Sequence, residues 1–240
     1  MINNKNGFGN DSHTEVYVMA PRIIDTINFD DISYRRASIT NYNDIRSSST
    51  QYNWGPTSFK LSGFTNQYLM ADFTPSINLD DFCIDFWVNI NNNSGRPFTD
   101  ALFVGFFKAT GHPEVPDFDN YCAVVIDNTY GNLYFNYISG GSTYFSAGGS
   151  VFDYDVDTWY HISAVRYNDS NLKIFINGNA VATDSIFDTN KRIVRDLDYQ
   201  LLLYHRATST TNRAFYVDVW RHSVGDYRWN RDFIIPNRYY

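Results

Sequence analysis

The feature of this 240-residue sequence that most limits its fold is a succession of about a dozen short apolar segments, each ended by Gly, Asn or Asp turn residues. Residues 82–90 alternate between apolar and other side chains, as in a strand with one buried face. Residues 101–108 are apolar almost throughout, so we expect a strand buried on both faces. Asn177-Gly178 supplies the two positive-φ positions of a type I′ hairpin. Short strands in this number predict a sandwich or a barrel.

Residue usage supports the same fold class. Of the 26 acidic residues, 24 are Asp and only Glu15 and Glu114 are Glu, while Asn occurs 26 times and Ala 12 times. Asp and Asn favour turns, whereas Glu and Ala favour helix interiors. We therefore expect an all-β chain, and no break in composition marks a second domain.

The ends of the chain suggest a simple organisation. Residues 1–21 are polar and predict an N-terminal arm or anchor, followed by one folded domain over residues 22–240. Within that domain we expect a first strand at residues 23–29 and a polar loop at residues 35–53. The formal charge of −7, from 19 basic and 26 acidic residues, excludes nucleic acid from the expected partners, because phosphate binding needs a basic surface.

Several segments, taken in order, resemble one known family. Phe82-Cys83-Ile84-Asp85-Phe86-Trp87-Val88 resembles the F-x-I-x-F-W-V strand of laminin-G-like jelly rolls, in the concanavalin A-like lectin/glucanase superfamily. One residue is inserted before Arg221 relative to the family's closing strand. The resemblance implies a two-sheet antiparallel jelly-roll sandwich. The other matching segments are residues 58–63, 68–69, 159–166, 172–178, 181–182, 217–221 and 233–236.

Because the match extends to the C-terminal segment at residues 233–236, the chain looks most like the jelly-roll modules of bacteriophage virion proteins. The resemblance implies a non-catalytic structural or adhesion protein: a tail fibre, a baseplate part or a capsid decoration. Its expected partners are other virion subunits, further copies of itself and host glycans. No secretion signal and no run of ~18 apolar residues is present, so we expect synthesis in the host cytoplasm, no membrane insertion, and location in the virion.

Two alternative functions stay open. One is a calcium-dependent carbohydrate-binding lectin module. The other is a degenerate glucanase, although the closely spaced Glu and Asp residues of that family's catalytic strand are absent. Glu15 falls in the expected arm and Glu114 in a loop between prolines, so we expect no catalytic residue.

A glycan-binding surface needs aromatic faces beside hydrogen-bonding side chains, and residues 130–137 combine Tyr with Asn. The alternative is that these rings only fill the two faces of a Tyr-rich sheet. The candidate ligand-binding residues are Trp54, Tyr130, Asn132, Tyr134, Asn136, Tyr137 and Tyr144.

Calcium is the one cofactor that the resemblance implies, because relatives bind it with Asp and Asn oxygens of rim loops. Asp117, Asp119 and Asn120 offer such oxygens, and an ordinary polar turn is the other interpretation.

Single residues carry further predictions. Cys83 and Cys122 lie in apolar segments, so we expect two free buried thiols, with a disulfide as the alternative. Asp218 in an apolar strand predicts a structural carboxylate that accepts hydrogen bonds from loop amides. Trp87 and Trp159 are expected between the two sheets.

Overall fold

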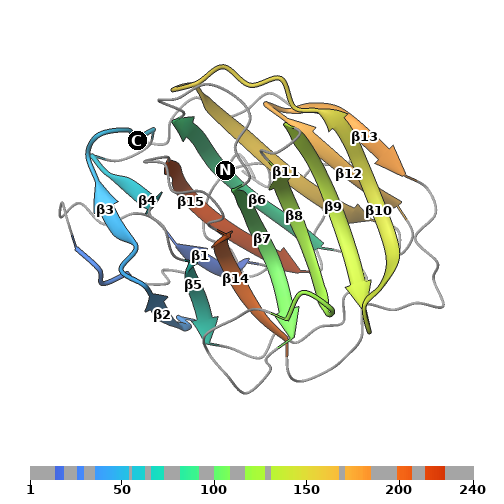
Figure 1. Cartoon of the computed structure of the whole chain (residues 1–240), viewed down its shortest axis with the longest axis horizontal. Helices are drawn as coiled ribbons and strands as arrows, with labels where there is room; N and C mark the ends of the chain where they lie inside the picture. Colours follow the sequence, from blue (N-terminus) through green and yellow to red (C-terminus); the bar gives the residue numbers. More distant parts are fainter. Residues whose placement is uncertain are drawn as a thin grey trace, which may run out of the picture.

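The computed structural model describes residues 14–18, 26–29, 36–53, 56–62, 66–72, 82–91, 100–108, 117–127, 131–167, 171–184, 199–206 and 214–224. Fifteen strands and no helix occur within these ranges, so this part of the chain holds no helix able to span a membrane. The strands form two antiparallel sheets, which Figure 1 shows as two layers, one behind the other. The expected all-β jelly-roll sandwich is therefore confirmed.

Sheet A has eight strands. Strand β15 uses one edge to pair with β6 and divides the other edge between β4 and β1. In spatial order the strands are β13 (Asn179–Asp184), β12 (Asn171–Ile176), β11 (Trp159–Tyr167), β6 (Phe82–Asn91), β15 (Ala214–Val224), β4 (Ser58–Ser62) and β3 (Arg46–Ser48), with β1 (Thr14–Val18) beside β15.

Sheet B has seven strands and forms the second layer (Figure 1). In spatial order they are β10 (Ser142–Val151), β9 (Asn132–Ser139), β8 (Tyr121–Asp127), β7 (Ala101–Lys108), β14 (Tyr199–Arg206), β5 (Gln67–Asp72) and β2 (Ser38–Tyr42).

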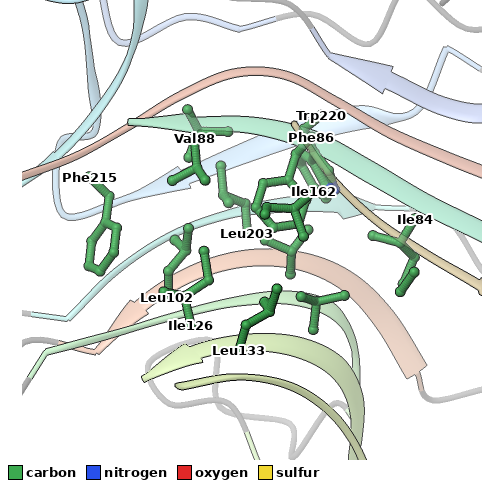
Figure 2. Close-up of a cluster of buried hydrophobic side chains, with 14 of the residues drawn as sticks. Ile84, Phe86, Val88, Leu102, Ile126, Leu133, Ile162, Leu203, Phe215 and Trp220 are labelled. Atoms are coloured by element: carbon green, nitrogen blue, oxygen red, sulfur yellow. The ribbon is translucent and has the colours of Figure 1, made fainter. Parts of the chain in front are cut away.

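The core lies between the sheets because alternation along each strand directs every second side chain inward. Figure 2 shows Ile84 of β6 and Ile162 of β11 from sheet A beside Leu102, Ile126 and Leu203 from sheet B. All of these side chains are fully buried. Each strand also has an outward face, and the two outer faces of the sandwich carry the groups considered below.

Strand β15 contains a β-bulge at Val219, whose φ is 56°. Such a value is rare for a β-branched residue. The extra residue shifts the alternation, so Val217 before the bulge and Trp220 after it both enter the core. Arg221 consequently points to the outer face of sheet A, where it meets Asp85. The bulge lies where the sequence showed an inserted residue before Arg221.

The clearest sequence predictions are confirmed. Asn177 and Gly178 have φ values of 50° and 82° and join β12 to β13 as a hairpin. The apolar segment 101–108 is β7, buried on both faces up to Lys108. The prediction for the tryptophans is wrong. Trp87 of β6 pairs with His161 of β11 and packs against it on the outer face of sheet A, and alternation along β11 places Trp159 on the same face. Among the described residues, Trp220 is the tryptophan that lies in the core.

The N-terminal part of the chain differs from the prediction. Residues 14–18 of the expected arm are strand β1, which pairs with β15 and buries Val18. Residues 1–13 and 19–21 lie outside the described residues. Residues 26–29 form no strand, although a strand was predicted at 23–29, and the expected loop at 35–53 contains the short polar strands β2 and β3.

Candidate functional site

The outer face of sheet B is rich in aromatic side chains, and we call this cluster the aromatic face. It is formed by outward residues of β2, β5, β14, β7, β8 and β9 together with Phe118 from the turn before β8. Its buried members are Tyr68, Ala101, Phe103, Phe107, Tyr121, Ala123, Val125 and Tyr204, and its half-buried members are Tyr42, Met70, Phe118, Tyr134 and Ile138.

Strand register aligns several of these side chains in one row. Tyr204 of β14 pairs with Tyr68 of β5 on one side and with Phe103 of β7 on the other. Phe103 pairs with Val125, which in turn pairs with Tyr134 of β9. Directly opposed residues of neighbouring strands have Cβ atoms about 4.5–5.5 Å apart, so this row forms a continuous apolar layer across the sheet, buried everywhere except at Tyr134.

Phe118 lies over the middle of the aromatic face. Its ring centroid is 5.4 Å from that of Phe103, 5.5 Å from that of Tyr204 and 6.1 Å from that of Phe107, in edge-on or tilted arrangements. These are favourable geometries for aromatic pairs. The contacts help to bury the three rings, whereas Tyr134 on the flanking strand β9 stays half-buried.

Arg206, the last residue of β14, places a positive charge on the aromatic face. Its guanidinium carbon lies 5.7 Å from the Phe103 ring centroid and 5.9 Å from the Phe118 ring centroid, within the range of cation–π attraction. Its Nε is buried without a hydrogen-bond partner, and no described carboxylate forms an ion pair with it. The described part of the chain therefore offers no acceptor to this Nε.

Other polar atoms of the face are also unpaired. The Tyr204 hydroxyl and Asn136 Oδ1 are buried without a hydrogen-bond partner, while Asn136 Nδ2 donates to the Tyr121 hydroxyl at 3.2 Å. Burial raises the pKa of Tyr204 and of Tyr134 to about 12, against the opposing charge of Arg206, and the negative charge of Asp127 adds to the rise for Tyr134. Both phenols are therefore protonated at neutral pH and can donate hydrogen bonds.

The structure brings together only part of the predicted ligand-binding set. Alternation along β9 places Asn132, Tyr134 and Asn136 on the outer face of sheet B, all half-buried. Tyr137 points the other way and is 2% exposed in the core between the sheets, so it does not belong to the candidate site. Tyr144 is a residue of β10, and Trp54 and Tyr130 lie outside the described residues.

The three residues predicted to bind calcium lie in one turn, at 117–120. Both carboxylate oxygens of Asp117 accept hydrogen bonds within this turn, from the Asp119 amide at 2.9 Å and from Asn120 Nδ2 at 2.8 Å. Asn120 Oδ1 accepts from the Gly140 amide at 2.8 Å. The described part of the chain contains no group of three His, Cys, Asp or Glu residues that could hold a metal ion. This turn positions Phe118, and calcium binding here stays a prediction.

The outer face of sheet A carries a buried polar cluster. Arg221 donates from Nη2 and Nε to Asp85 Oδ2 at 2.8 and 3.0 Å. His161 Nε2 lies 3.7 Å from Asp85 Oδ1, and Cys83 Sγ lies 3.5 Å from both Asp85 Oδ2 and Ser163 Oγ. We call these five residues the ionic cluster, and all of them are fully buried.

The charges of the ionic cluster compensate one another. Burial favours a higher pKa for Asp85, but the charge of Arg221 and the nearby imidazole of His161 hold it well below its usual range. Burial lowers the pKa of His161, so this imidazole is neutral at pH 7. The cluster offers a single carboxylate, whose Oδ2 is held by Arg221, whereas retaining glycosidases use two. We therefore assign it to the structure of sheet A and not to catalysis.

His222, next to Arg221, points from the same strand into the core. Its ring packs edge-on against Phe106 at 4.7 Å, and neither ring nitrogen has a hydrogen-bond partner. Burial lowers its pKa to about 3, so this imidazole is neutral across the physiological range.

The smaller predictions on cysteine and aspartate are confirmed. Cys83 and Cys122 are both free and buried, one on the outer face of sheet A and the other in the core. Asp218 Oδ2 accepts a hydrogen bond from the amide of Asn53, a loop residue, at 3.0 Å.

Sequence reasoning missed Arg206, Phe118 and the aromatic residues of β7 and β14. Alternation does assign Tyr204 and Arg206 to one face of their strand. The signal that joins them to Tyr134 is the strand order β14-β7-β8-β9, which a single sequence does not reveal.

Two stacked antiparallel sheets in this order define a jelly-roll sandwich of the lectin type. A family model described as the Concanavalin A-like lectin/glucanases superfamily matches residues 63–201, more than half of the chain, and the chain belongs to this superfamily. A comparison with curated protein sequences finds no match.

Solved structures with a similar fold include receptor-binding domains of botulinum neurotoxins. The serotype C1 binding domain has a TM-score of 0.61 at 16% identity, over 88% of this chain and 48% of that one. The DC binding domain in complex with rat synaptotagmin II has a TM-score of 0.63 at 14% identity, over 88% and 48%. A type C structure, titled for cell entry dependent on two ganglioside molecules, has a TM-score of 0.61 at 15% identity, over 88% and 48%. The chain thus spans about half the length of these structures, and the likeness shows the fold.

Proposed function

We propose that this chain is a non-catalytic adhesion domain that binds carbohydrate on the aromatic face of sheet B. The observation that carries the proposal is the half-buried part of the aromatic face, where Tyr134 lies next to Asn136 on β9, and where Asn136 and Arg206 have polar atoms without hydrogen-bond partners. Sugar rings stack their C–H faces on aromatic rings and exchange hydrogen bonds with adjacent amides and hydroxyls. Membership of a lectin-containing superfamily, and the glycan-binding and protein-binding neighbours, support this class of function.

The setting that we propose for this adhesion is a bacteriophage particle, in which the chain docks on other virion subunits and on further copies of itself. This part of the proposal rests on the sequence resemblance to virion jelly rolls. It is tested by mass spectrometry of purified particles of the phage that encodes the chain. Absence of the chain from those particles would show that this setting is wrong without touching the carbohydrate-binding proposal.

Binding is tested by calorimetric titration with a panel of neutral and acidic oligosaccharides. We expect Tyr134→Ala to weaken binding by about fivefold to tenfold, since a stacked aromatic contact contributes about 0.5–1.5 kcal/mol beyond its buried area. The matched control is Tyr52→Ala, because Tyr52 is a 52% exposed tyrosine outside sheet B. Equal loss in both variants, or no binding to any member of the panel, would refute the proposed function.

The same titrations distinguish the calcium-dependent alternative. Under our proposal, removal of calcium by a chelator leaves the affinity unchanged, because Asp117 accepts hydrogen bonds within the turn and Asn120 Oδ1 accepts from the amide of Gly140. A calcium-dependent lectin would instead lose binding with chelator and regain it on addition of calcium.

A further inference from the structure

Arg206 is a positively charged group of the aromatic face that forms no ion pair with any residue that the structure describes. Its guanidinium lies over Phe103 and Phe118, and its Nε is buried without an acceptor. A buried donor without a partner costs about 1–3 kcal/mol, and more when it is charged. The attraction of the two ring faces offsets only part of that cost.

The surroundings of Arg206 indicate what the missing partner is. Tyr121, Tyr134 and Tyr204 belong to the same cluster. Asp127 of β8 lies on the same face, separated from Arg206 by Ala101 of β7. Aromatic rings and neutral hydroxyls do not neutralise a guanidinium, and no ion pair joins Asp127 to Arg206 among the described residues. A planar guanidinium pairs best with a carboxylate, which can accept two parallel hydrogen bonds from it.

We propose that Arg206 binds the carboxylate of an acidic sugar residue, a uronic or a sialic acid, whose ring lies against the half-buried part of the aromatic face beside Phe118. This inference rests on the proposed function and adds the chemical class of the ligand. The Tyr204 hydroxyl, buried without a partner, is the second donor on the same strand. The net charge of the chain is −7, so the protein as a whole does not attract an acidic ligand, and the local positive charge of Arg206 supplies that attraction.

The test uses two pairs of probes that differ in their acid group. One pair is 3′-sialyllactose and lactose, and the other is a β-linked disaccharide ending in glucuronic acid and its counterpart ending in glucose. We expect the wild-type chain to bind the acidic member of at least one pair about tenfold or more tightly, as a charged hydrogen bond provides. The pair that shows the preference identifies the acid as sialic or uronic.

Variants of Arg206 then show whether this residue causes the preference for acidic over neutral sugars. We expect Arg206→Gln to bring the ratio of acidic to neutral affinities to near one. Arg206→Lys keeps the positive charge but loses the paired N–H donors of the planar guanidinium, so it should retain part of the preference for the acidic probe. The matched control is Lys173→Gln, because Lys173 lies 5.3 Å over the Tyr167 ring, a cation–aromatic contact on sheet A. This control should leave the ratio unchanged.

The outcomes separate this inference from the proposed function. Equal affinity for acidic and neutral probes overturns the assignment of Arg206 while the binding surface stands. A preference for acid that persists in Arg206→Gln also overturns it. Binding of no probe at all overturns both. If Arg206→Gln does not fold, the salt dependence of the wild-type ratio decides, because a partly exposed ionic contact weakens as ionic strength rises and a purely steric preference does not.

Discussion

The two outer faces of the sandwich each hold an arginine, and the two residues are in opposite situations. Arg221 on sheet A is fully buried and donates twice to Asp85, so its charge is neutralised within the chain. Arg206 on sheet B is half-buried, lies on aromatic rings, and has no carboxylate partner among the described residues. The comparison teaches that charge alone does not mark a binding site. A charge that the fold has paired serves stability, and one that it leaves unpaired at an accessible surface is available to a ligand.

The largest effect on stability is expected for a substitution in the ionic cluster of sheet A. We expect Arg221→Met to lower the free energy of unfolding by about 3–5 kcal/mol, because it leaves the buried carboxylate of Asp85 uncompensated. Urea denaturation followed by tryptophan fluorescence measures the loss. The double variant Asp85→Leu/Arg221→Met is the control and should recover most of it. A loss below about 1 kcal/mol would contradict the structural role of the ionic cluster.

A second prediction concerns acid stability. The pKa of His222 is near 3 in the folded chain, whereas an unfolded histidine titrates near 6.5. Between these values the unfolded chain binds more protons, so stability falls as pH falls from 6.5 toward 3. At pH 5 the linkage amounts to about 2 kcal/mol relative to pH 7.

His222→Leu should remove this contribution and flatten the pH dependence in that window, as urea titrations at pH 7 and pH 5 would show. Asp85 and His161 add acid sensitivity of the same sign in both proteins, because Asp85 has a lowered pKa and His161 stays neutral when buried. An unchanged difference between pH 7 and pH 5 in the variant would show that His222 is not the group responsible.

The smallest effect on stability is expected on sheet B, and it sharpens the contrast. The buried hydroxyl of Tyr204 has no hydrogen-bond partner, so Tyr204→Phe should change the free energy of unfolding by less than about 1 kcal/mol. If that hydroxyl serves the ligand, affinity for the acidic probes falls while stability does not. A clear loss of stability would instead show that the hydroxyl has a structural role.

Much of the fold could be predicted because strands buried on one or both faces have a strong periodic signal. Residues 82–91 and 101–108 follow such patterns, and Asn177-Gly178 has the turn chemistry of its hairpin. The polar strands β2 and β3 lie at sheet edges, where few side chains need to be apolar. Their sequences therefore resemble loops, and pairing with a neighbour is what makes them strands.

The candidate site was predicted only along one strand. Asn132, Tyr134 and Asn136 were found because they are neighbours in sequence, and Tyr137 was included for the same reason although alternation turns it into the core. Arg206 follows Tyr134 by more than seventy residues, and the two meet only through the order of the strands between them. Identifying the site thus required long-range pairing, which local patterns do not encode.

The bulge at Val219 lets strand β15 hold one residue more than the segment of β6 that it faces. If the bulge were flattened with all residues kept, simple alternation would turn Trp220 outward and carry Arg221 into the apolar interior. Deletion of Val219 itself would instead leave Trp220 inward and Arg221 outward, because Asp218 and Trp220 already face consecutive residues of β6. A strand shorter by this one residue is therefore compatible with the sandwich, whereas a single insertion or deletion between Trp220 and Val224 is not, and grafts or tags belong outside residues 214–224.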